Sequence, residues 1–143
     1  MRSAFAPYSL ISTVSSCTMK PQSASQLAAK KCQPCEGGVQ PLWPQEAAKQ
    51  LDKLQGWYLA KDSKAIRKDW LVKDFATAIA FFHEIAKIAE REDHHPDLHL
   101  IDYREVTVEL TTHAIGGLSE NDFILAAKID QIPVALRKLA KKK

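Results

Sequence analysis

Apolar and polar positions follow regular patterns only from Pro41 onward. In that part of the chain, apolar side chains recur at helical spacing in three stretches, and this spacing predicts an amphipathic helix in each. The three predicted helices cover residues 43–54, residues 75 up to the histidines at 94 and 95, and residues 123–132.

The predicted helices also carry boundary signals. Pro44 suits a first helical turn, and Gly56 suits a helix end. Asp74 can cap the second helix, and Ser119 with Asp122 three residues later has the pattern of a capping box. These signals place the helix starts close to residues 44, 75 and 120.

The stretches between the helices have the composition of β-strands. In one of them Val106, Val108 and Leu110 alternate with polar residues, as expected of a strand with one buried face. By the same alternation, His113 belongs to the polar side of that strand. Four strands forming two hairpins are predicted, at residues 57–60, 66–72, 98–103 and 105–113.

The order of elements is therefore α-β-β-α-β-β-α. Such an order predicts an α+β fold, in which a four-stranded antiparallel sheet has three helices packed on one face. The other face of the sheet would stay uncovered, so we expect self-association into a homodimer or homotetramer. The apolar helix at residues 123–132 is expected to serve as an interface as well as a core element.

Composition is that of an ordinary globular domain. The chain has 143 residues, of which 45% are hydrophobic and 26% charged, which suits one domain plus a tail. The longest apolar-rich stretch, residues 76–82, is far shorter than a membrane span. The net charge of +3 is mild and its basic residues are scattered, so neither nucleic acid nor a membrane is expected as a partner.

The first 39 residues differ from the rest of the chain. No Asp or Glu occurs before Glu36, while basic residues are spread among many serines and alanines. This is the composition of a transit peptide. We therefore expect residues 1–39 to be a disordered extension that folding does not need, and residues 40–143 to be the folded domain. A mitochondrial location is preferred to a plastid one, and a cytoplasmic location is the alternative.

The three cysteines, Cys17, Cys32 and Cys35, all lie in this extension and do not make a disulfide framework. Cys32 and Cys35 have the spacing of a metal or redox pair. A structural zinc site needs four ligands, however, and the sequence has no second such pair. We interpret the cysteines as a spare pair in a flexible segment.

Histidines gather in the stretch "AEREDHHPDLH" at residues 89–99, and His113 follows in the last predicted strand. Three interpretations remain open from spacing alone. His94 or His95 can complement the negative end of a helix dipole, the histidines can bind a metal, or neutral imidazoles can transfer protons near pH 7. No histidine pair within one helix has the i and i+4 spacing of a helical zinc site.

The wider pattern resembles a known family, the pterin-4a-carbinolamine dehydratases. The elements that fit that family's pattern, in chain order, are Glu90, His94-His95-Pro96, Tyr103, His113 and Asp122. The segments "GWYL" at residues 56–59, "THAIGGLSENDFILAAKID" at 112–130 and "KKCQPC" at 30–35 resemble its plant-type branch. The resemblance covers about residues 40–132. The sequence departs from the animal relatives at Leu98, near which they carry a tryptophan. The loop there is also one residue longer in this chain.

This resemblance implies a hydro-lyase without a cofactor or metal, which converts 4a-hydroxytetrahydropterin to quinonoid dihydropterin and water in pterin cofactor recycling. It implies that His94 and His113 act as acid and base on the two sides of the pterin, and that His95 holds and polarises the substrate. The substrate-binding residues expected with them are Glu90, Asp93, Pro96 and Thr112.

The alternative function is non-catalytic, as a dimerisation or assembly cofactor for another protein, a second use of the fold among the family's relatives. The three intact histidines favour the enzyme. Asp122 is interpreted mainly as a helix cap, while His83 on the polar side of its helix and His99 in the longer loop are interpreted as surface residues.

Overall fold

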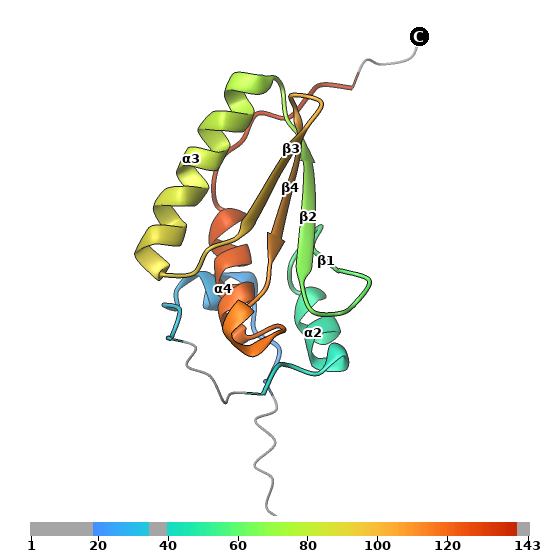
Figure 1. Cartoon of the computed structure of the whole chain (residues 1–143), viewed down its shortest axis with the longest axis vertical. Helices are drawn as coiled ribbons and strands as arrows, with labels where there is room; N and C mark the ends of the chain where they lie inside the picture. Colours follow the sequence, from blue (N-terminus) through green and yellow to red (C-terminus); the bar gives the residue numbers. More distant parts are fainter. Residues whose placement is uncertain (1–18, 35–39, 140–143) are drawn as a thin grey trace, which may run out of the picture.

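The computed structural model describes residues 19–34 and 40–139 (Figure 1). Four strands form one antiparallel sheet in the order β1-β2-β4-β3, and helices lie beside it, so the predicted α+β class is confirmed. The elements are, in chain order, α1 (Ala24–Ala28), α2 (Pro44–Leu51), β1 (Tyr58–Leu59), β2 (Ile66–Leu71), α3 (Phe75–Glu92), β3 (Asp97–Ile101), β4 (Glu105–Leu110), the 3-10 helix η1 (His113–Ile115) and α4 (Glu120–Ile129).

The helix starts follow the predicted signals, whereas α2 and α4 end at Leu51 and Ile129, three residues before the predicted ends at 54 and 132. Pro44 opens α2, and the Asp74 carboxylate accepts a hydrogen bond of 2.8 Å from the Thr77 amide at the start of α3. At the start of α4, Asp122 accepts from the Ser119 amide at 2.9 Å, which completes the predicted capping box. Each of these helices therefore begins where a side chain accepts from a free amide, or where a proline, which has no N–H, occupies the first turn.

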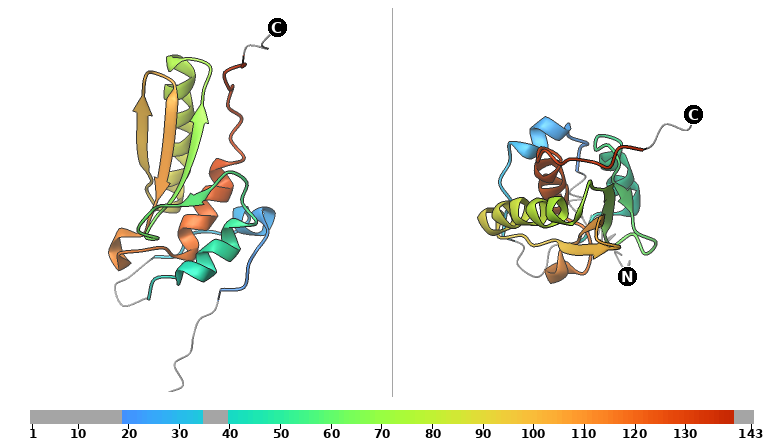
Figure 2. Two further views of the ribbon diagram at one scale, coloured as in Figure 1. Left: turned by 90° about the vertical axis from the view of Figure 1, so that its right-hand side faces the viewer. Right: turned by 90° about the horizontal axis from the view of Figure 1, so that it is seen from above.

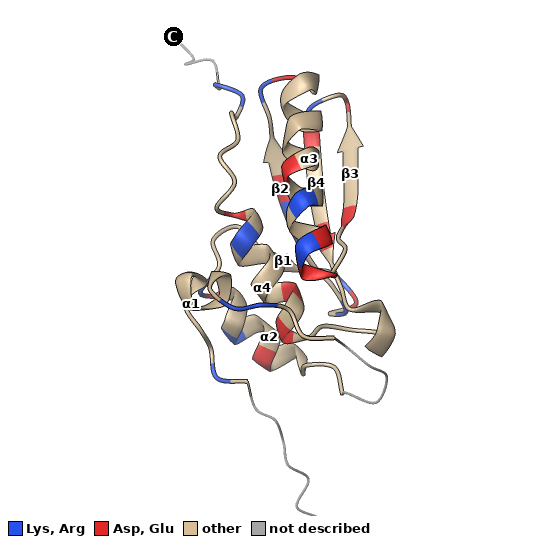
Figure 3. Ribbon diagram, turned by 90° about the vertical axis from the view of Figure 1, so that its left-hand side faces the viewer, with Lys and Arg blue, Asp and Glu red and all other residues tan. Residues whose placement is uncertain are grey.

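One face of the sheet forms the core. Val106, Val108 and Leu110 of β4 are buried, as their alternation predicted, and helix α3 lies along this face. A series of edge-to-face aromatic contacts crosses the core: the rings of Trp57 and Trp70 are 5.9 Å apart, and those of Trp70 and Phe81 are 5.2 Å apart. Figure 3 shows charged residues along the outer side of α3.

Helix α4 is more deeply buried than we expected. Every residue from 121 to 127 is buried, as is Ile129, because α1, α3 and the rest of the core surround the helix (Figure 2). The prediction that this helix also serves as an interface between copies is therefore wrong. Its apolar side chains are already in contact with their own chain.

Part of the supposedly disordered extension is folded. Residues 19–34 contain helix α1, which packs against α4, and Leu27 and Cys32 belong to the hydrophobic core. Residues 19–34 are thus packed on the domain. They are not part of a disordered extension, as we had expected for residues 1–39. Residues 1–18 and 35–39, including Cys17, Cys35 and most of the proposed transit peptide, lie outside the described residues.

Two details of the second hairpin also differ from the prediction. Strand β3 begins at Asp97, so His99 lies on an edge strand and not in a loop, although its side chain is exposed as expected. Strand β4 ends at Leu110, because the Thr112 amide bonds to the Gly117 carbonyl and the chain then turns into η1. His113 therefore lies on a 3-10 turn and not on the strand.

After α4 the chain runs extended beside the end of β2, where Lys73 and Ala135 share a backbone hydrogen bond of 2.9 Å. Pro133 follows the last turn of α4, as predicted for a helix-breaking residue. Within residues 19–34 and 40–139, no helix is long and apolar enough to cross a membrane.

Candidate active site

The three predicted catalytic histidines line one pocket. His94 and His95 come from the chain just after α3, and His113 comes from η1, so residues far apart in the sequence meet at the end of the sheet nearest α4. The pocket has a volume of about 340 Å³. A larger depression of about 560 Å³ between α3 and α4 contains no histidine, and we place the site by its chemistry and not by its size.

The end of α3 directs the two adjacent histidines apart. Asp93 adopts a left-handed conformation with φ 51°, and the His94 amide still donates to the Ala89 carbonyl at 3.2 Å. After this turn the His94 side chain is directed inward, 11% exposed, whereas that of His95 is 58% exposed. Pro96 disfavours a helical conformation at His95, the residue before it. Adjacent imidazoles therefore have different surroundings.

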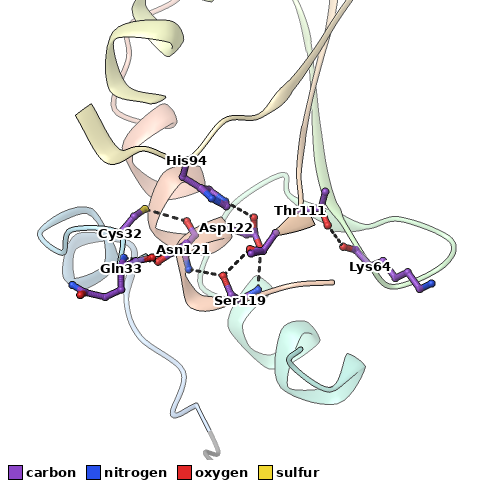
Figure 4. A network of polar contacts seen from close by, with 9 residues as sticks. Cys32, Gln33, Lys64, His94, Thr111, Ser119, Asn121 and Asp122 are labelled. Atoms are coloured by element: carbon purple, nitrogen blue, oxygen red, sulfur yellow. Dashed lines mark hydrogen bonds and ion pairs between the residues drawn. The ribbon is translucent and has the colours of Figure 1, made fainter. Parts of the chain in front are cut away.

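His94 is held by a buried carboxylate. Its Nε2 lies 2.7 Å from Oδ1 of Asp122, whose side chain is fully buried (Figure 4). The other oxygen of Asp122 accepts from the Thr112 hydroxyl at 2.8 Å and from the Ser119 amide at 2.9 Å. Three donors thus surround one carboxylate, and this compensates for the cost of burying its charge.

This contact determines which nitrogen of His94 can take part in chemistry. An ionised carboxylate only accepts hydrogen bonds, so Nε2 must carry the hydrogen. In the neutral ring the free lone pair is then on Nδ1, which can accept a proton. The arrangement is that of a base oriented by a buried acid.

His95 has a weaker partner. Its Nε2 lies 2.8 Å from Oε1 of Glu90, but both side chains are largely exposed, so water and salt screen the interaction. Glu90, predicted as a substrate-binding residue, is thus the hydrogen-bond partner of His95. Asp93 lines the pocket, while Glu90 and Pro96 lie outside it.

Thr112 lines the pocket and is buried, and its hydroxyl contacts Asp122 and Ser119. Its contacts in this structure thus support the carboxylate behind His94. His113 is exposed at the start of η1, where Gly116, with φ 66°, ends the turn.

Sequence reasoning missed five residues of the pocket wall and one contact. Gln33, Pro34, Thr111, Ala114 and Asn121 also line the pocket, and Asp122 is a partner of His94 as well as a helix cap. The "CQPC" segment and the capping box lie at some of these positions, but neither pattern indicates which residues are opposite in space. Among the residues that the structure describes, no three His, Cys, Asp or Glu side chains are grouped to hold a metal ion.

Comparisons with known proteins agree on one family. Residues 40–132 match the family model described as pterin 4 alpha carbinolamine dehydratase. Over 115 residues, which are 78% of this chain and 62% of the relative, the chain is 47% identical to a protein of Arabidopsis thaliana named pterin-4-alpha-carbinolamine dehydratase 2, mitochondrial. The match thus spans less than two thirds of that relative's length.

A bacterial relative and a solved structure are similar over nearly their whole length. The chain is 50% identical to a putative pterin-4-alpha-carbinolamine dehydratase of Nitrosospira multiformis over 74% of this chain and 91% of the relative. The crystal structure titled transcriptional coactivator/pterin dehydratase from Brucella melitensis matches with a TM-score of 0.59 and 36% identity, covering 63% of this chain and 95% of that one.

Proposed function

The chain belongs to the pterin-4-alpha-carbinolamine dehydratase family, and from this membership we propose that it is a hydro-lyase that dehydrates a 4a-hydroxytetrahydropterin. The products are quinonoid dihydropterin and water, which returns the pterin to a form that a reductase can recycle. The observation that best supports this function is a histidine oriented by a buried carboxylate in the same pocket as a second histidine from a different element.

The reaction needs an acid and a base and no change of oxidation state. The bond between C4a and the hydroxyl oxygen breaks, one proton goes to the departing hydroxyl, and one proton leaves the ring system, so the protons balance. We propose that His94 and His113 exchange these protons on the two sides of the flat pterin. A positioned acid or base of this kind contributes about 10²–10⁴ in rate.

The remaining pocket residues are proposed to bind the substrate. His95, oriented by Glu90, would hold and polarise the pterin, and Asp93 would accept hydrogen bonds from its amino or ring N–H groups. Pro96 would contribute indirectly, by restricting the backbone conformation of His95. Thr112 would act at the pocket wall and through Asp122.

Turnover of a synthetic 4a-hydroxytetrahydropterin by the purified, metal-free chain is the direct test of this function. We expect formation of quinonoid dihydropterin to be accelerated over the uncatalysed reaction, and the acceleration to be lost in a variant that lacks both His94 and His113. An uncatalysed rate in the presence of well-folded wild-type protein would refute the proposal.

The alternative, a non-catalytic assembly cofactor, is not favoured. The Brucella protein's title names a coactivator as well as a dehydratase, so the fold alone does not separate the two uses. Here the histidine set is complete and His94 has a dedicated buried partner, which an assembly surface would not need. A chain that binds another protein but does not turn over the pterin would support the alternative.

We also propose that the chain is of the plant type and is directed to mitochondria. The acid-free start of the sequence and the similarity to the mitochondrial Arabidopsis protein support this proposal. Bacterial relatives are equally similar, so the acid-free start is the stronger of the two supports. A fluorescent fusion of the full chain should enter mitochondria; a diffuse cytosolic signal would support the cytoplasmic alternative.

A further inference from the structure

Residues 19–34 precede the part of the chain that matches the family model, yet they contact the core of the domain. We call them the N-terminal segment. Leu27 on α1 is fully buried, and the side chain of Gln50 on α2 exchanges two hydrogen bonds of 2.8 Å with the Gln22 backbone. At its first turn the segment is thus fixed both by apolar burial and by a buried amide.

Further along, the segment is attached to the ends of α3 and α4. The Glu92 carboxylate accepts a hydrogen bond of 2.9 Å from the Cys32 amide and also contacts the Lys128 ammonium. Lys30 pairs with Glu120 on the outside of α4. These contacts bring the segment past the point where α3 ends and the histidines begin.

The last contact lies at the pocket. The Asn121 side chain accepts from the Gln33 amide at 3.0 Å and donates to the Gln33 carbonyl at 2.6 Å (Figure 4). A side-chain amide that pairs with both backbone groups of one residue fixes that residue much as a neighbouring strand would. Gln33 and Pro34 line the same pocket as His94, His95 and His113.

Asn121 is directly followed in the sequence by Asp122, the partner of His94. The first turn of α4 therefore holds the N-terminal segment with one residue and orients His94 with the next. We propose that the N-terminal segment forms one wall of the histidine pocket, and that Asn121 is the positioning residue that holds this wall beside the substrate. This inference rests on the proposed function.

A wall of this kind is expected to affect substrate binding more than chemistry. It removes one side of the pocket from water and confines a flat ligand between two surfaces, but it contributes no acid or base. Loosening it should raise KM and leave kcat nearly unchanged, which is the signature of lost uniform binding. Substitution of a residue with a purely structural role would lower stability without raising KM at constant kcat.

Two variants of the full chain loosen the wall in different ways. Asn121→Ala removes both hydrogen bonds to Gln33, whereas the double variant Gln33→Gly, Pro34→Gly removes the side chains that line the pocket and keeps the bonds to Asn121. The matched control is Lys30→Ala, which removes the ion pair to Glu120 from the same segment but lies outside the pocket. If Asn121→Ala does not fold, the double variant still provides the test.

We expect KM to rise roughly tenfold in both wall variants, equivalent to about 1.4 kcal/mol, with kcat within about twofold of wild type. Binding of a stable dihydropterin, followed by quenching of tryptophan fluorescence, should weaken by a similar factor. Lys30→Ala should behave as wild type in both measurements. Unchanged KM and unchanged dihydropterin binding in folded wall variants would overturn the inference.

The failure of this inference differs from the failure of the proposed function. If the wild type does not turn over the carbinolamine, the proposed function fails, whatever the wall variants do. If the wild type is active and the loss of His94 and His113 abolishes activity, but the wall variants bind pterin normally, only the inference about the N-terminal segment is refuted.

Discussion

At the scale of single residues, Asp122 has two roles: it caps helix α4 and it contacts the proposed catalytic residue His94. One of its oxygens completes the capping of α4, and the other holds His94. The cap could be predicted, because Ser119 and Asp122 interact across three residues. The contact with His94 could not, because it joins residues 28 positions apart that only the packing of α4 against α3 brings together.

Replacing Asp122 by Asn tests this double role. The single oxygen of Asn is expected to face the Ser119 amide and the Thr112 hydroxyl, so its NH₂ group would face Nε2 of His94. The imidazole would then have to carry its hydrogen on Nδ1, the wrong tautomer for a base, and would lose the nearby negative charge. We expect kcat to fall by about 10² or more for the substrate whose hydroxyl departs on the His94 side of the pterin.

The control for Asp122→Asn is Ser119→Ala, which removes a capping hydroxyl without touching His94. Its effect should appear in the unfolding midpoint and cost about 1 kcal/mol of stability, with little change in kcat. Equal kinetic losses in the two variants would show that Asp122 acts only through the stability of α4.

The environment of Glu92 is expected to make the stability of the fold depend on pH. Burial acts to raise the pKa of its carboxyl, but the hydrogen bonds from Lys128 and the Cys32 amide, with the Lys128 charge, lower it below the ordinary 4.5. A pKa that is lowered in the folded state gives stability that is present above the unfolded value and lost as pH falls through the folded one. Urea unfolding between about pH 5 and pH 3 should show this loss, and Glu92→Gln should reduce it. An identical acid dependence in Glu92→Gln would contradict the assignment.

At the scale of elements, the strands and the three long helices could be predicted, because their apolar spacing repeats over many residues. Helix α1 could not. It has five residues and one fully buried side chain, and its serine- and alanine-rich surroundings have the composition of a disordered tail. What orders it is the set of partners supplied by α2, α3 and α4, which no local pattern indicates.

Leu27→Ala measures how firmly α1 is attached. Leu27 is fully buried against the core, so we expect the free energy of unfolding to fall by about 2–5 kcal/mol, the range for removing a large apolar side chain from a core. Leu139→Ala is the control, because that side chain is 81% exposed and its loss should change stability by less than about 0.5 kcal/mol. A negligible effect of Leu27→Ala in urea unfolding would mean that α1 is detached in solution.

At the scale of the whole molecule, we expected the uncovered face of the sheet to drive self-association. This face carries several polar side chains. Asp69 accepts hydrogen bonds from the hydroxyls of Tyr58 and Thr107, and Arg67 pairs with Glu109, so this face can remain in water. Exposed apolar side chains are found on edge strand β3, where Ile101 is 63% exposed, and at the start of α3, where Phe75 and Ile79 lie one turn apart and are each about half exposed.

Self-association into a dimer or tetramer remains our prediction, and it now involves the start of α3. The extended C-terminal chain, with the half-exposed Leu136, is bonded beside the same end of β2 and adds to the apolar surface there. Light scattering at micromolar concentration should give a mass above one chain, and Ile79→Glu should lower it. A monomer for the wild type would contradict the prediction, and an unchanged oligomer in Ile79→Glu would exclude this surface.

The most direct test of the central claim is turnover of the two substrate epimers, whose hydroxyl groups depart from opposite faces of the pterin. If His94 and His113 lie on opposite sides of the bound ring, His94→Ala and His113→Ala should each slow mainly one epimer, with opposite preferences, by about 10²–10⁴ in a stopped-flow assay. His95→Ala should impair both epimers, mostly through KM. Near-normal turnover of both epimers by folded variants of all three histidines would contradict the account and favour the assembly cofactor instead.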